Sequence, residues 1–135
     1  MSRELEERNL KTVQALFAAT GSGDWAKAET LLTDDLMITE ADNNPFRGVY
    51  RGRRALHDLF AKVMSEVSVT KLDTKQLTAG GDLVIAVVEL TLAGPPERVA
   101  ALLELFRLRD GKVCEIKPYY FDPTPLADAI AGKRR

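Results

Sequence analysis

Apolar residues recur at spacings of three and four along the first twenty positions, which is the pattern of an amphipathic helix. Leu10, Val13 and Leu16 share one side of a helix that we predict over residues 4–20. The Gly-Ser-Gly turn that follows ends this helix, and Asp24 is placed to cap a short second helix. The chain is therefore expected to begin with two helices joined by a tight turn.

A third helix is predicted over residues 53–65, where apolar positions again recur every three or four residues. Before it, the Thr-Asp-Asp sequence at 33–35 is expected to end the second helix, and a strand is expected over residues 36–41. Two asparagines, a proline and two glycines between Asp42 and Gly52 predict a loop.

The hydrophobic period changes to two after residue 67, and this is the period of β-strands. Strands are predicted at residues 67–78, 82–93, 98–109 and 112–121, with a short helix after them over 125–131. Helices followed by an antiparallel meander define an α+β fold. We expect a curved antiparallel sheet packed with three helices of the N-terminal half around an apolar pocket. With no repeat or linker in the sequence, residues 1–135 are expected to form one domain.

Glu104 occupies an otherwise apolar face of the strand predicted at 98–109. The residues that share this face are Ala100, Leu102, Phe106 and Leu108. Burying a carboxylate is costly unless it is paired or protonated, and acidic groups in apolar clefts are frequently functional. Glu104 is therefore a candidate functional residue.

Glu40 repeats this arrangement on the strand predicted at 36–41, because it shares a face with Leu36 and Ile38. Two structural alternatives remain open. Glu40 could reach solvent at the end of its strand, and Glu104 could form an ion pair with an arginine. The arginines considered for that pair are Arg53, Arg54 and Arg98.

Both faces of the strand predicted at 82–93 are largely apolar. One face carries Val84, Ala86 and Val88, and the other carries Leu83, Ile85 and Val87. Since only one face can meet the helices, the other needs a different cover. A second copy of the same sheet is the simplest candidate, so a homodimer through the sheet is predicted.

Composition narrows the functional classes. The chain has a net charge of −1, which argues against nucleic-acid binding and against a polybasic membrane anchor. One cysteine, Cys114, excludes an internal disulfide and suits the cytoplasm. His57 is the only histidine, so no histidine-based metal site is expected.

The order of elements and several short segments resemble the nuclear transport factor 2-like superfamily across nearly the whole chain, within it the SnoaL-like and ketosteroid-isomerase-like branches. The segments are TGSGDW at 20–25, LLTDD at 31–35, FRGVYRGRRAL at 46–56 and LFRLRDGKVCEIKPYYFDP at 105–123. The resemblance implies a cone-shaped α+β fold that hosts isomerases, cyclases, dehydratases, epoxide hydrolases and non-catalytic proteins.

The resemblance also implies roles for individual residues. The position of the ketosteroid isomerase base falls on Glu40, and that of its protonated acid falls on Glu104. That acid is a general example of a carboxylic group kept neutral by an apolar site. The position of the tyrosine that completes the oxyanion hole falls on Leu16, which cannot donate a hydrogen bond. Tyr120 is the candidate to replace it.

We therefore expect a pocket protein for a small apolar or carbonyl-containing molecule, in which Glu40 and Glu104 move a proton next to a carbonyl without a cofactor. Binding without chemistry, a protein-interaction domain and an epoxide hydrolase are the alternatives. The expected ligand-binding residues, besides the two glutamates, are Leu16, Phe17, Trp25, Leu36, Ile38, Phe60, Leu102, Phe106 and Tyr120.

Overall fold

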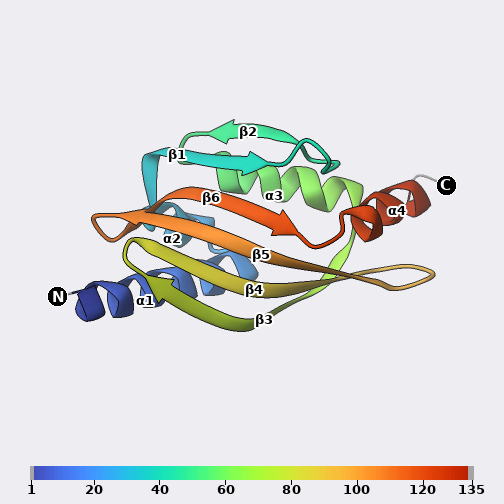
Figure 1. Cartoon of the computed structure of the whole chain (residues 1–135). Helices are drawn as coiled ribbons and strands as arrows, with labels where there is room; N and C mark the ends of the chain where they lie inside the picture. Colours follow the sequence, from blue (N-terminus) through green and yellow to red (C-terminus); the bar gives the residue numbers. More distant parts are fainter. Residues whose placement is uncertain (1, 134–135) are drawn as a thin grey trace.

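The computed structural model describes residues 2–133, which form four helices and one six-stranded sheet (Figure 1). The helices are α1 (Ser2–Gly21), α2 (Trp25–Thr30), α3 (Ala55–Glu66) and α4 (Thr124–Lys133). The strands are β1 (Leu32–Glu40), β2 (Gly48–Arg51), β3 (Val69–Gly80), β4 (Leu83–Leu92), β5 (Arg98–Arg109) and β6 (Lys112–Tyr120). The predicted α+β fold is confirmed.

The strands follow the order β2-β1-β6-β5-β4-β3 across the sheet. Strands β3 to β6 form the predicted antiparallel meander, but β1 pairs with β6 in parallel, so the sheet is mixed rather than antiparallel. The prediction was wrong at this point because hydrophobic periodicity identifies a strand and not its neighbour. β1 lies beside the last strand of the meander, far away in sequence.

Two predicted boundaries near the N-terminal half also need correction. Residues 33–35 do not end helix α2, because β1 already begins at Leu32, whose side chain is buried. The segment predicted as a loop contains the short strand β2, which pairs antiparallel with β1 from Met37 to Glu40. Glycine and proline signals masked this strand, which has only four residues.

Asp24 caps α2 as predicted, since its carboxylate accepts a hydrogen bond of 3.1 Å from the backbone N–H of Lys27. Helices α1, α2 and α3 lie on one face of the sheet, and α4 lies at the end where β5 begins (Figure 1). None of the helices within residues 2–133 combines the length and the hydrophobicity needed to cross a membrane.

The core lies between these helices and the inner face of the sheet. Inward side chains of β4 and β5 alternate with outward ones as the period of two predicts, with Val84, Ala86 and Val88 buried on β4. On β5, Ala100, Leu102 and Phe106 are buried, and Glu104 lies between them. The sheet therefore presents one face to the helices and leaves the other without a helix over it (Figure 1).

Candidate active site in the cone

A cavity of about 570 Å³ lies between helices α1 and α3 and the inner face of the sheet, a size typical of small-molecule sites. Its walls are mainly apolar. Helix α3 contributes Leu56, Leu59, Phe60, Val63 and Met64. Strands β1, β5 and β6 contribute the polar groups Glu40, Glu104 and Tyr120.

Glu40 is the last residue of β1 and its side chain is only 7% exposed. The alternative in which it reaches solvent is therefore wrong. One carboxyl oxygen, Oε1, accepts a hydrogen bond of 2.7 Å from Nδ2 of Asn44. Burial, followed by repulsion from Glu104, raises the pKa of Glu40 to about 8.

Glu104 lies two strands away, in the middle of β5, and pairs across the ladder with Pro118 of β6. Since neighbouring strands are spaced by about 4.8 Å, the backbones of β1 and β5 are about 10 Å apart where β6 runs between them. Burial raises the pKa of Glu104 to about 7. The cavity thus holds two carboxyl groups that both resist ionisation.

Neither carboxyl group is neutralised by a cation within the described chain. Glu40 and Glu104 take part in none of the ion pairs among residues 2–133. The arginines considered as partners of Glu104 are engaged elsewhere: Arg53 with Asp34, Arg54 with Glu29, and Arg98 with the backbone oxygen of Pro96. The structural ion-pair alternative is therefore wrong.

Tyr120 ends β6 and brings the only phenol among the described residues that line the cavity. Burial and the neighbouring Glu40 and Glu104 raise the pKa of Tyr120, so it stays a neutral O–H donor. Within residues 2–133 its hydroxyl makes no hydrogen bond. A donor without a partner, facing the same cavity as two carboxyls, is available to a ligand.

The predicted wall residues divide into two groups. Phe17, Phe60, Leu102 and Tyr120 line the cavity together with both glutamates. Leu16, Leu36, Ile38 and Phe106 instead belong to the buried core, where Phe106 supports Phe17 through an edge-to-face contact of 5.6 Å. Trp25 lies behind the wall, stacked on His57 at 4.3 Å and in edge contact with Phe60.

Several cavity residues were not singled out from the sequence. Leu56, Leu59, Val63 and Met64 were visible only as the apolar stripe of the third predicted helix. Asn44 does not line the cavity, and the sequence indicates only that it belongs to a loop; in the structure it is 2% exposed and donates a hydrogen bond to Glu40. A buried partner for Glu40 could have been sought there, because asparagine four residues after a carboxylate lies within reach across a turn.

No group of three or more histidine, cysteine, aspartate or glutamate side chains in the described part of the chain could hold a metal ion. The cavity lining includes two carboxyls, a phenol, the ammonium group of Lys71 and threonine hydroxyls. These groups can accept, donate and share protons.

The SnoaL-like domain family model matches residues 13–116. The chain therefore belongs to the SnoaL-like family. A search of curated proteins found no match.

Solved structures with the same fold cover nearly the whole chain. A nuclear transport factor 2-like protein from Burkholderia xenovorans is 24% identical, with a TM-score of 0.78 over 93% of this chain and 97% of its own. A protein from Jannaschia assigned as a SnoaL-like polyketide cyclase is 21% identical, with a TM-score of 0.79 over 93% of each chain. TerC, co-crystallised with polyporic acid, is 15% identical, with a TM-score of 0.80 over 92% of this chain and 98% of its own. At these identities the likeness establishes the fold.

Proposed function

We propose that this protein is an enzyme that transfers a proton next to a carbonyl on a small, mostly apolar substrate, as an isomerase or cyclase does. The observation that carries the proposal is the pair of carboxyls, Glu40 and Glu104, with raised pKa values at one mainly apolar cavity. The cavity is also lined by Lys71, which pairs with Asp73 and with neither glutamate. Such groups exchange protons near neutral pH, where an ordinary carboxylate is too weak a base. The fold and the name of the Jannaschia relative are compatible with this chemistry.

In the proposed reaction, Glu40 accepts the proton from carbon and a neutral Glu104 donates a hydrogen bond to the developing enolate oxygen. Because the two carboxyls repel each other, the pair passes through a singly ionised state near neutral pH. The pKa values alone would leave the remaining proton on Glu40. We assign the base to Glu40 because the hydrogen bond from Asn44 favours its ionised form and because the family resemblance points the same way.

Tyr120 is proposed to supply the second hydrogen bond to the enolate oxygen, in place of the hydroxyl that Leu16 cannot provide. Its free O–H and its position in the cavity wall support this role. Leu16 is buried in the core, so a hydrogen-bond donor at this position would be separated from the cavity by the surrounding side chains.

The proposal can be tested by incubating the protein with a panel of cyclic ketones and enones in D₂O and following loss of α-proton signals by NMR. Glu40→Gln should slow exchange at least about 10²-fold while calorimetry shows unchanged binding. Glu97→Gln, on an exposed loop, is the matched control and should exchange normally. If the wild type instead binds compounds of the panel tightly but exchanges the α-protons of none, the protein is a non-catalytic binding protein.

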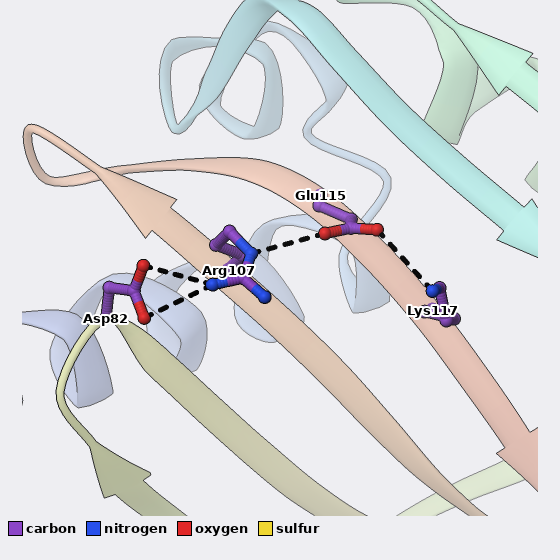
Figure 2. Close-up of polar contacts among 4 residues, drawn as sticks. All are labelled: Asp82, Arg107, Glu115 and Lys117. Carbon is purple, nitrogen blue, oxygen red and sulfur yellow. Dashed lines mark hydrogen bonds and ion pairs between the residues drawn. The ribbon is translucent and has the colours of Figure 1, made fainter.

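We also propose that the protein forms a homodimer through the outer face of the sheet. Val87, Leu103 and Tyr119 lie opposite one another on β4, β5 and β6 and are 38%, 46% and 52% exposed. Beside this row, Arg107 pairs with Asp82 and Glu115, and Glu115 pairs with Lys117 (Figure 2). Two charges of each sign let this face meet a second copy without net repulsion. The predicted cytoplasmic location stays a prediction.

A further inference from the structure

Asn44 uses both ends of its side-chain amide in the loop between β1 and β2. Its Nδ2 donates to Oε1 of Glu40 at 2.7 Å, and its Oδ1 accepts from the backbone N–H of Phe46 at 2.8 Å. The side chain is 2% exposed, so water does not compete for either bond. A buried amide with both ends engaged is held in one orientation.

The loop that carries Asn44 is itself anchored. The backbone N–H of Asn44 donates to the oxygen of Ala41, and the side chain of Phe46 is buried. From β2, the hydroxyl of Tyr50 donates to the backbone oxygen of Phe46 at 2.7 Å. The Phe46 N–H, which cannot accept, forces the oxygen of the Asn44 amide toward itself and the NH₂ group toward Glu40.

We propose that Asn44 is a positioning residue that confines the exchangeable proton of Glu40 to its Oε2 atom. Oε1 already accepts the N–H of Asn44, and a proton on Oε1 would be directed against that donor. When Glu40 is neutral its hydrogen therefore lies on Oε2, and when Glu40 is ionised Oε2 is the oxygen left to accept one. A single oxygen of the carboxyl then gives and takes the proton.

The same hydrogen bond keeps Glu40 able to ionise. The titratable groups that face Glu40 are Glu104 on β5 and Tyr120 on β6, and neither brings a positive charge. The wall residues of α1 and α3 are apolar or carry a hydroxyl, and Lys71 of β3 is paired with Asp73. Since an N–H bonds more strongly to a carboxylate than to a neutral carboxyl, Asn44 opposes the burial that raises the pKa of Glu40.

The test is a carbon-13 NMR titration of Glu40 in the wild type and in Asn44→Leu, with infrared spectroscopy of the protonated carboxyl. Removing the donor should raise the pKa of Glu40 by about one to two units, the equivalent of a hydrogen bond to a charged group. The C=O stretch of neutral Glu40 should move to higher frequency, because its Oε1 loses a hydrogen bond. An unchanged titration and an unchanged stretch in folded Asn44→Leu would overturn the proposal.

Two further variants separate positioning from stability. Asn44→Asp keeps the oxygen that Phe46 needs but replaces the donor with an acceptor, so the pKa of Glu40 should again rise, even if Asn44→Leu does not fold. Tyr50→Phe removes an anchor of the loop without touching Glu40 and should leave its titration unchanged. An equal rise in Tyr50→Phe would show that loop stability alone is responsible and would overturn the proposal.

The catalytic consequence of this inference rests on the proposed function, but the titration needs no substrate. If no ketone exchanges in the wild type while Asn44→Leu still shifts Glu40, the proposed reaction fails and the role of Asn44 stands. If the wild type exchanges α-protons but Glu40 titrates identically in Asn44→Leu and in the wild type, the role of Asn44 fails and the reaction stands.

Discussion

Glu40 on β1 and Glu104 on β5 face one cavity from either side of strand β6, and their mutual repulsion adds to the burial that raises the pKa of Glu40. The two groups are coupled through the space of the cavity and not through a shared hydrogen bond. Removing the charge of one carboxyl should therefore shift the pKa of the other.

We predict that Glu104→Gln lowers the pKa of Glu40 from about 8, because it removes the repulsion while leaving the burial in place. Carbon-13 NMR of the glutamate carboxyls measures this directly. Glu97→Gln, at an exposed position, should leave the titration of Glu40 as in the wild type. If Glu104→Gln leaves Glu40 unaffected, the two groups do not sense each other.

Folding stability should fall as the pH rises from about 5 to above 8. Between the ordinary pKa of 4.5 and the raised values of about 7 and 8, the folded state binds more protons than the unfolded state. The contribution of these two carboxyls to the free energy of unfolding is therefore complete below pH 4.5. It is lost as each carboxyl ionises in the folded state. Urea unfolding at pH 5 and at pH 8.5 should differ by about 6 kcal/mol if these two groups dominate. A flat profile would contradict raised pKa values for the two unpaired carboxyls.

Replacing Glu104 by leucine should stabilise the protein by about 1–3 kcal/mol at pH 8, because a half-buried carboxyl is exchanged for an apolar side chain among apolar neighbours. The gain should shrink at pH 5, because Glu104 is then neutral in the folded state and its burial no longer opposes a charge. Chemical unfolding at the two pH values measures it. Loss of stability at both would mean that Glu104 has a partner that holds the fold together.

Tyr120→Phe should reduce α-proton exchange by about 10²-fold with little change in stability, because the lost hydroxyl has no partner in the described chain. Tyr119→Phe is a control on the next residue, whose side chain is on the outer face of the sheet and 52% exposed. Equal effects of the two substitutions would argue against Tyr120 as a donor to the substrate.

Leu103→Lys should convert a dimer to a monomer, because it places a charge in the middle of the exposed row on the outer face. Light scattering at low micromolar concentration measures the change in mass. Val49→Lys, an equally exposed position on β2 at the edge of the sheet, should leave the mass unchanged. A wild type that is already monomeric would refute the homodimer.

The alternation of strands allowed Glu104 to be recognised, since Ala100, Leu102 and Phe106 fixed its face and the burial of these residues agrees. The same reasoning found Glu40. It could not separate Leu102, which lines the cavity, from Leu36 and Ile38, which fill the core. Period defines the side to which a residue points and carries no information about how deep it lies.

Two contacts that shape the site were not predicted from the hydrophobic pattern, one between distant segments and one within a loop. The parallel pairing of β1 with β6 depends on where the chain returns after the meander. The hydrogen bond from Asn44 to Glu40 spans four residues and depends on how the loop between β1 and β2 turns. The strand β2, which has only four residues, was not recognised in the sequence. A loop signal predicts a turn but not which side chain the turn buries.

The groups proposed for the chemistry are carried by strands, whereas much of the cavity wall comes from helices. Glu40, Glu104 and Tyr120 are held in a hydrogen-bonded sheet, whose spacing fixes them relative to one another. Phe60, Val63 and Met64 project from one side of α3 and can be exchanged without disturbing that spacing. The range of molecules that the cavity admits could thus change through α3 alone, while the groups proposed to handle the proton keep their places.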